Sequence, residues 1–274
     1  MVEGVSVRPG WVGQLQEFYS YRELLINLTI RDLRVKYKGS VLGVAWSLLN
    51  PLLQMAIYTL IFSLFLRIVV LPNFWAFVVG GILVWTFFST CMGNAAPVFV
   101  RNPNLISKVY FPIECLPLSM VLANFVNFLI PMAILVPVLF LVHIPLGPSL
   151  ALLPIIMIAQ LLMSIGLSLI VASLTVYLRD IEHFLLLGLQ VLFYASPILY
   201  PLRTSMLPHG AAKFVTILHL NPLSWYLNCY HDVLFFGQWP DGLDFWLMVA
   251  FSLVSLVGGY LVFLALRPRL PESV

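Results

Sequence analysis

Charged residues are scarce in this sequence, and their scarcity excludes most soluble architectures. Only 9% of its 274 residues are Asp, Glu, Lys or Arg, whereas 61% are hydrophobic. Soluble globular domains carry about a quarter charged residues. Because the apolar residues recur in long runs along the whole chain, the composition indicates a protein that crosses a membrane several times.

Cysteine is also scarce, and several site motifs are missing. Cys91, Cys115 and Cys229 lie far apart, so neither a disulfide framework nor a thiolate metal site is expected. The sequence has no Gly-Lys pair, and therefore no G-x-x-x-x-G-K-[ST] loop for binding ATP. No ionisable side chain stands near the middle of an apolar run, which disfavours proton- and sodium-coupled carriers. Any energy for transport would have to come from another chain.

Six apolar segments reach the length of about 20 residues that a membrane-spanning helix needs. They lie at about 41–66, 73–95, 114–142, 149–178, 184–201 and 243–266. The sequence therefore predicts an all-α polytopic membrane protein with a six-span domain over residues 41–266, a cytoplasmic segment over 1–40 and a cytoplasmic tail over 267–274. Residues 1–40 lack the apolar core and cleavage site of a signal peptide, so no removable leader is expected.

Lysine and arginine are distributed unequally between the two sides of this arrangement. With both ends on one side, that side carries Arg8, Arg22, Arg31, Arg34, Lys36, Lys38, Arg101, Lys108, Arg179, Arg267 and Arg269. The other side carries Arg67, Arg203 and Lys213. The positive-inside rule then places both termini in the cytoplasm. The cluster from Arg31 to Lys38 is explained by this rule alone, as a topology signal.

The segment before the first span has the pattern of an amphipathic helix. From Trp11, apolar residues recur every three or four positions through Leu15, Phe18, Tyr21, Leu25 and Leu28. Such a helix lies in the cytoplasmic interface of the membrane. It either anchors the chain at the surface or shapes a lateral entrance for a lipid-linked substrate.

Polar residues follow one face of two predicted spans. The first span carries Ser47, Asn50, Gln54 and Tyr58 at spacings of three, four and four. The fourth carries Gln160, Ser164, Ser168, Ala172 and Thr175, and the third is marked by Asn124 and Asn127. Lipid cannot satisfy these groups, so each face either contacts other helices or lines a hydrated path.

Two cytoplasmic loops are suited to contacting a partner. In the loop from Asn94 to Pro112, Asn102 or Asn104 can cap a short, partly apolar helix flanked by Arg101 and Lys108. A helix of this kind can insert into a groove on another protein. The second loop, "YLRDIEH", concentrates charge between Tyr177 and His183. Both loops are also compatible with ordinary solvated turns.

The stretch "RDLRVKYKGSVLGVAWSLLNPLLQMAIYTLIFSLFLRI" resembles the first span of the membrane subunits of type-2 ABC exporters. The resemblance is to the branch that exports O-antigens, capsular polysaccharides and wall teichoic acids. It continues in order through "NLISKVYFPIECLPLS", "YLRDIEH", "SPILYP" and "LNPLSWY", and covers about residues 30 to 240. Where the family usually has an Arg after the Asn-Pro motif, this chain has His231 and Asp232.

The resemblance implies a homodimer of this chain with two cytoplasmic ATP-binding subunits, in a bacterial cytoplasmic membrane. The partner subunits would hold ATP and Mg, so this chain would bind no cofactor or metal, perform no catalysis and contact no nucleic acid. The export route would lie at the dimer interface and carry a polymer linked to undecaprenyl diphosphate. Short helices between the fifth and sixth spans, from Leu202 to Asp241, would re-enter the membrane from the exoplasmic side.

The resemblance also implies three groups of site residues. The loops that couple to the ATP-binding subunits would use Arg101, Asn104, Leu105, Ile106, Lys108, Arg179, Asp180 and Ile181. The lipid diphosphate head group would contact Arg31, Arg34 and Lys38, which share a face if their helix continues to the membrane, whereas Lys36 points elsewhere. The translocation path would include Trp46, Ser47, Asn50, Gln54, Tyr58, Trp85, Phe88, Tyr194 and Tyr200, although aromatic residues at span ends also form interfacial belts.

Two other classes of function remain open. A membrane enzyme acting on lipid-linked sugars could use His209, His219, His231 and Asp232, which share one predicted exoplasmic loop but have no recognised metal-ligand spacing. An ion-coupled carrier or a channel is the other alternative. The sequence does not distinguish among the exported polymers.

Overall fold

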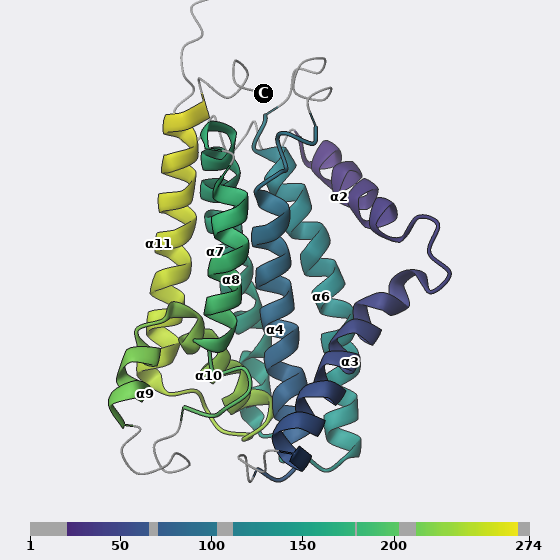
Figure 1. The fold of residues 1–274 in the computed structure, drawn as a ribbon, viewed down its shortest axis with the longest axis vertical. Coiled ribbons are helices and arrows are strands. Elements are labelled where there is room, and N and C mark those ends of the chain that lie inside the picture. The colour runs from purple at the N-terminus through teal and green to yellow at the C-terminus, as the bar shows by residue number, and fades with distance from the viewer. Residues whose placement is uncertain (1–20, 66–70, 103–111, 179, 203–211, 268–274) are drawn as a thin grey trace, which may run out of the picture.

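The computed structural model describes residues 21–65, 71–102, 112–178, 180–202 and 212–267. This part of the chain is helical, with no strand, and its long helices stand side by side in a bundle (Figure 1). The helices are α2 (Arg22–Tyr37), α3 (Trp46–Thr59), α4 (Phe74–Ala95), α6 (Cys115–Leu141), α7 (Leu153–Tyr177), α8 (Ile181–Tyr194), α9 (Ala212–His219), α10 (Pro222–Leu234) and α11 (Gly242–Leu266). The prediction of an all-α polytopic membrane protein is confirmed.

The bundle has two distinct ends. Helix α2 and the last turns of α11 lie at one end, here the α2 end, and α9 and α10 lie at the other, here the α10 end (Figure 1). The described start and finish of the chain thus share one end of the bundle. Which end faces the cytoplasm stays a prediction.

Five helical segments are long and apolar enough to cross a membrane. They are Gly43–Phe62, Phe74–Ala95, Cys115–Leu141, Pro148–Tyr177 and Gly242–Leu266. The predicted span at 184–201 differs, because helix α8 begins at Ile181 and already ends at Tyr194. At 1.5 Å per residue its 14 residues reach only about 21 Å, less than the hydrocarbon thickness of about 30 Å.

The early end of α8 has a local cause. Pro197 has no N–H to continue the helix and disfavours helical geometry at Ser196 before it. The side chain of Asn221 then donates hydrogen bonds to the carbonyl oxygen of Ala195 (3.1 Å) and to Oγ of Ser196 (2.8 Å). These bonds hold the turn that leads from α8 toward α9 and α10.

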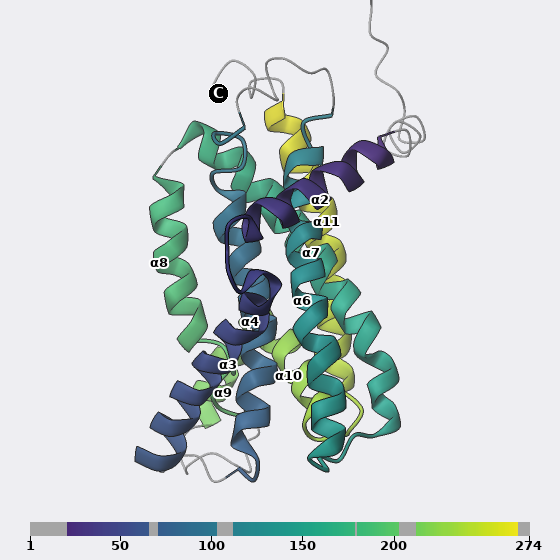
Figure 2. The ribbon, with the colours of Figure 1, turned by 90° about the vertical axis from the view of Figure 1, so that its right-hand side faces the viewer.

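Helix α2 lies obliquely to the bundle and packs against α6 (Figure 2). Leu28 is buried at this contact, the hydroxyl of Tyr37 donates to Oδ1 of Asn127, and Oγ of Ser119 lies 3.4 Å from Oδ2 of Asp32. The helix ends at Tyr37, and Gly39 adopts a φ of 78° that ends the helical path. The helix therefore does not continue through Lys38 to the membrane. The segment from Trp11 to Phe18, where the amphipathic pattern begins, lies outside the described residues.

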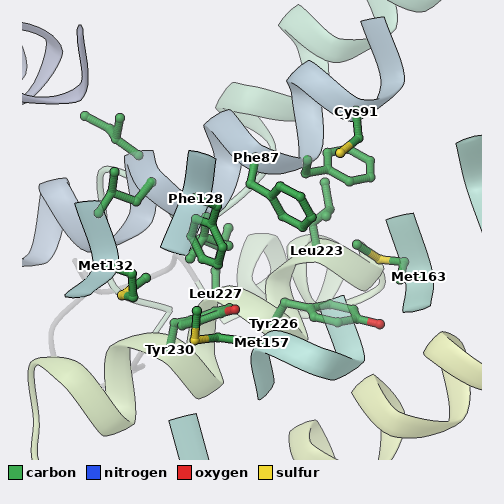
Figure 3. Packing of buried hydrophobic residues seen from close by; sticks show 14 of the residues in the cluster. Phe87, Cys91, Phe128, Met132, Met157, Met163, Leu223, Tyr226, Leu227 and Tyr230 are labelled. Carbon is green, nitrogen blue, oxygen red and sulfur yellow. The ribbon is translucent and has the colours of Figure 1, made fainter. Parts of the chain in front are cut away.

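Helix α10 is the most deeply embedded of the short helices. Tyr226 and Tyr230 on this helix are fully buried. The rings of Phe128 and Tyr230 pack edge to face, with their centroids 6.4 Å apart. Figure 3 shows these tyrosines among Phe87, Phe128 and the sulfur-containing side chains of the core. Short helices between the fifth and sixth apolar segments are thus present as predicted, and their depth in a bilayer stays a prediction.

The polar stripe of α7, which consists of Gln160, Ser164, Ser168, Ala172 and Thr175, is buried inside the protein. Gln160 donates to the carbonyl oxygen of Val84 (2.9 Å) and accepts a hydrogen bond from the hydroxyl of Tyr230 (2.8 Å). Ser164 and Ser168 are fully buried where α7 packs against neighbouring helices. Of the two alternatives for this stripe, the structure selects helix packing.

Candidate functional site

The polar residues Ser47, Asn50, Gln54 and Tyr58, here the stripe of α3, have a different environment from the polar residues of α7. Pro51 is the one buried residue of α3, whereas Asn50 and Gln54 are exposed. Ser47, half-buried, donates to the carbonyl oxygen of Val44 (2.7 Å). The middle of this stripe therefore faces away from the rest of the described chain.

Aromatic rings connect α3, α4 and α8 around Phe193. The centroid of the Phe193 ring lies 5.7 Å from the ring centroid of Tyr58, 5.5 Å from that of Trp85 and 5.2 Å from that of Tyr194. The hydroxyl of Tyr200 donates to the carbonyl oxygen of Tyr194 (2.9 Å). Phe193 thus brings together three of the predicted path residues, and Tyr200 is joined to Tyr194 through a backbone carbonyl. The sequence did not single out Phe193, because it lies in a largely apolar stretch.

Of the other aromatic path residues, Phe88 packs against this cluster, with its ring centroid 5.9 Å from that of Trp85, whereas Trp46 lies apart from it. Trp46 begins α3 near the opposite end of that helix and is 39% exposed. Phe88 is only 5% exposed and belongs to the hydrophobic core, so its side chain does not reach an open face of the chain. Tyr194, at 63%, is the most exposed of the group.

Helices α3 and α8 both carry exposed faces. Helix α8 stands apart from the main bundle on the same side as α3 (Figure 2). Most of its surface is exposed, at His183, Phe184, Leu186, Leu187, Gly188, Gln190, Val191 and Tyr194. Exposed apolar residues of α3 include Leu52, Leu53 and Ile57, and the exposed Leu60 directly follows the helix. These helices thus present apolar faces with a few polar groups among them.

The predicted head-group residues line one cavity. This outer cavity, of about 920 Å³, lies between α2 and α6 and includes Arg31, Arg34 and Lys38 in its lining. Its apolar wall includes Val126 and Ile130 of α6. The three cations share the cavity even though α2 ends at Tyr37. The chain turns after this residue, and Lys38 still lies at the edge of the cavity.

A second cavity lies on the other side of α2. This inner cavity, of about 670 Å³, is lined by Lys36 and Arg101 together with the amides of Asn94, Asn124 and Asn127. Desolvation by the surrounding protein lowers the pKa of Lys36 below its usual range. Sequence reasoning placed Lys36 away from the other cations but did not find this cavity; Asn124 and Asn127 on the third span were the available signal.

Arg31 stands between the two cavities and lines both. Its Nη2 lies 2.7 Å from Oδ1 of Asp32, and Nε donates to the same oxygen at 2.9 Å. This pair holds the guanidinium in one position. It also neutralises part of the positive charge, so Arg34 and Lys38 carry most of the uncompensated charge of the outer cavity.

The described parts of the two predicted coupling loops lie at the α2 end. Arg101 is exposed and borders the inner cavity, and Asp180 and Ile181 begin α8. The remaining predicted coupling residues, Asn104, Leu105, Ile106, Lys108 and Arg179, lie outside the described residues. His209, one candidate of the enzyme alternative, does so too, and the described residues contain no group of three His, Cys, Asp or Glu that could hold a metal ion.

Comparisons of the sequence with known proteins identify a family and several relatives. A family model described as ABC-2 type transporter matches residues 23–235. An O-antigen export system permease protein RfbA of Myxococcus xanthus is 33% identical over 264 residues, which cover 95% of this chain and 98% of that protein. An O-antigen export system permease protein RfbA of Klebsiella pneumoniae is 36% identical over 218 residues, which cover 78% of this chain and 81% of that protein.

Proposed function

The chain belongs to the ABC-2 type transporter family, as a permease of its polysaccharide-export branch, and we propose that it moves an undecaprenyl-diphosphate-linked polymer across the bacterial cytoplasmic membrane. It is a transport subunit rather than an enzyme. The polymer is an O antigen, as the names of its relatives state for those proteins, or a related polysaccharide or wall teichoic acid.

The outer cavity is the observation that carries this proposal. It combines Arg34 and Lys38 with the apolar wall formed by Val126 and Ile130, beside a helix that lies obliquely to the spans. A diphosphate needs cations that donate charge-assisted hydrogen bonds, and the attached lipid needs an apolar surface next to them. The cavity supplies both within one space of about 920 Å³.

A second copy of the chain completes the export route. Asn50 and Gln54 are exposed on a helix whose surroundings would otherwise be lipid. Hydrocarbon cannot satisfy their amides, whereas water in a path between two copies can. Tyr58, Tyr194 and Tyr200 would add aromatic faces on which sugar rings stack.

Two cytoplasmic ATP-binding subunits drive the cycle and hold ATP and Mg. The family of this chain and its lack of a P-loop support the assignment of ATP binding to the partner subunits and of transport to this chain. The partners dock at the α2 end, where α4 ends a few residues before Arg101 and α8 begins directly after Asp180. Movement of these loops would then reach the inner cavity directly, through Arg101.

Reconstitution tests the proposal. The chain is co-expressed with its ATP-binding subunit and inserted into liposomes that contain an undecaprenyl-diphosphate-linked oligosaccharide. We expect ATP-dependent movement of the oligosaccharide to the far leaflet, and ATPase activity that the lipid-linked substrate stimulates. A partner variant with its P-loop lysine replaced is the control. Full movement without ATP hydrolysis, or none with an active ATPase, would contradict the proposal.

A further inference from the structure

The inner cavity adjoins both the outer cavity and the stripe of α3. Arg31 and Asn127 line the inner and the outer cavity, so the two spaces meet at these side chains. A small pocket of about 60 Å³ shares Lys36 and Asn127 with the inner cavity and extends to Ser47, at the start of the stripe of α3. The inner cavity itself, of about 670 Å³, lies within the range of small-ligand sites, about 300–1,000 Å³.

The lining of the inner cavity carries a net positive charge. Among the described residues, its charged members are three cations and one carboxylate, namely Arg31, Lys36, Arg101 and Asp32. Oδ1 of Asp32 pairs with Arg31, and its Oδ2 lies 3.4 Å from Oγ of Ser119. In the part of the chain that the structure describes, neither Lys36 nor Arg101 forms an ion pair. Two positive charges without a countercharge attract an anion.

Lys36 is partly removed from water at this cavity. Desolvation of its ammonium group by the surrounding protein lowers its pKa. The ring centroid of Tyr37 lies 5.9 Å from Nζ of Lys36, and this cation–π contact supplies no countercharge. An anion in the cavity would stabilise the charged form of Lys36.

Two buried amides supply uncharged donors beside these cations. Asn127 is 7% exposed, and its Nδ2 donates to the carbonyl oxygen of Ala123 at 3.0 Å. An amide nitrogen carries two N–H groups, so one of them remains for a ligand. Asn124 is 6% exposed, and its Nδ2 lies 3.2 Å from Sδ of Met120. Because sulfur is a weak acceptor, a ligand oxygen would be a stronger partner for this amide.

The charge and the donors together suit a ligand with two phosphate groups. Phosphate oxygens accept charge-assisted hydrogen bonds from ammonium and guanidinium groups and further hydrogen bonds from amides. Lys36 comes from α2 and Arg101 from the segment after α4, so the two cations approach the cavity from different elements. A diphosphate can use both cations at once, whereas a single phosphate group has less need of the second.

We propose that the inner cavity is a second binding site for the diphosphate of the exported lipid, which the head group enters after the outer cavity. Lys36 and Arg101 bind phosphate oxygens there, and Asn124 and Asn127 donate to them. This inference rests on the proposed function and deepens it, since it gives the head group a route past Arg31 to the stripe of α3. Capture of the lipid from the membrane stays with the outer cavity and its apolar wall.

Protection of introduced thiols in the purified full-length chain tests the second site. Asn94→Cys places a thiol at an exposed position of the inner cavity, and Ile30→Cys places one at the outer cavity alone. The native cysteines are buried, so N-ethylmaleimide reports on the introduced thiols. We expect pyrophosphate to slow labelling at position 94, and farnesyl diphosphate in detergent to slow labelling at both positions. Sulfate at equal ionic strength is the control for salt effects.

A second substitution in the Asn94→Cys background connects the protection to Lys36. Lys36→Gln should raise the pyrophosphate concentration that gives half-protection about tenfold, because a charge-assisted hydrogen bond is lost. Lys36→Arg keeps the charge and should restore most of the protection. The matched control is Arg22→Gln, which removes a cation of α2 that lines neither cavity and should leave protection unchanged.

Three results would overturn the second site. The first is protection at position 94 that is absent or unaffected by Lys36→Gln, and the second is protection by orthophosphate or sulfate at a lower concentration than by pyrophosphate. The third is protection by farnesyl diphosphate at position 30 alone, because the head group would then not reach the inner cavity. The test needs no ATP-binding subunit, so a failed second site with intact ATP-driven export would leave the proposed function standing. Intact protection without export would leave the diphosphate site standing.

Discussion

Arg34 and Lys36 are two positions apart in α2, yet they line different cavities. Successive residues of an α-helix are rotated by about 100°, so positions two apart point to nearly opposite sides. Arg34 therefore shares the outer cavity with Lys38, whereas Lys36 faces Asn124 and Asn127 across the inner cavity. The chain thus provides its own matched pair of cations for a test.

Arg34→Gln and Lys38→Gln are expected to lower export of lipid-linked polymer and substrate-stimulated ATPase activity more than Lys36→Gln does. Each charge-assisted hydrogen bond to the diphosphate contributes roughly 1.5–3 kcal/mol, which corresponds to about a tenfold or larger loss of apparent affinity. Transport assays at varied substrate concentration would measure this loss. Membrane insertion and partner binding should be unchanged in all three variants. Equal, near-native export by all three at matched expression would leave the cations as topology signals alone.

Among the elements, α7 and α11 make the closest contact. A Cβ atom on Gly259 would lie 2.1 Å from the carbonyl oxygen of Gly166, and one on Gly166 would lie 2.0 Å from that of Ser255. Two helix backbones can approach so closely only where no large side chain stands between them at the point of contact. Small residues therefore let these two helices pack along the buried polar stripe of α7.

Gly259→Ala is expected to destabilise this contact, because the added methyl group collides with backbone and not with a movable side chain. Overpacking of this kind costs roughly 1–3 kcal/mol. Thermal unfolding of the detergent-solubilised chain would report the loss as a lower midpoint. Gly258→Ala is the control, since a Cβ there meets no atom within 4 Å. Equal midpoints for the two variants would contradict the close contact.

The loop between α4 and α6 carries the prediction about coupling. Leu105→Asp with Ile106→Asp should leave the chain inserted but release or uncouple the ATP-binding subunit, because a partner groove cannot accept buried unpaired charges. Co-purification and ATPase measurements would show the effect. Leu105→Val with Ile106→Val keeps the apolar character and serves as the control. Survival of both the complex and transport in the Asp variant would mean that another loop couples the subunits.

At the scale of the whole molecule, orientation is the property to test. A cysteine introduced in the loop at 143–148 should react with an impermeant thiol reagent from outside intact cells, and one at position 108 should not. The native cysteines give a low background, because Cys91, Cys115 and Cys229 are all buried. Burial also raises the pKa of Cys229, which keeps its thiol protonated and unreactive. Labelling of position 108 from outside would show that the orientation is the reverse of the predicted one.

The sequence by itself determined the class of the molecule, since a chain that is 61% hydrophobic must bury its apolar runs in a membrane and close its backbone hydrogen bonds within helices. It also indicated the family, through several motifs in the right order. The rotation between Arg34 and Lys36 followed from helix geometry alone. These features depend on composition and on local spacing, which are properties of the chain before it folds.

Only the tertiary structure decided which polar groups are buried and which remain open. The stripes of α3 and α7 both recur at helical spacings of three and four, yet Gln160 is enclosed by α4 and α10 while Gln54 is exposed. The difference lies in which helices pack against each stripe, and neighbours in space are not encoded in the period of one helix. The inner cavity arises in the same way, because it joins α2, α4 and α6 from positions that are far apart in the sequence.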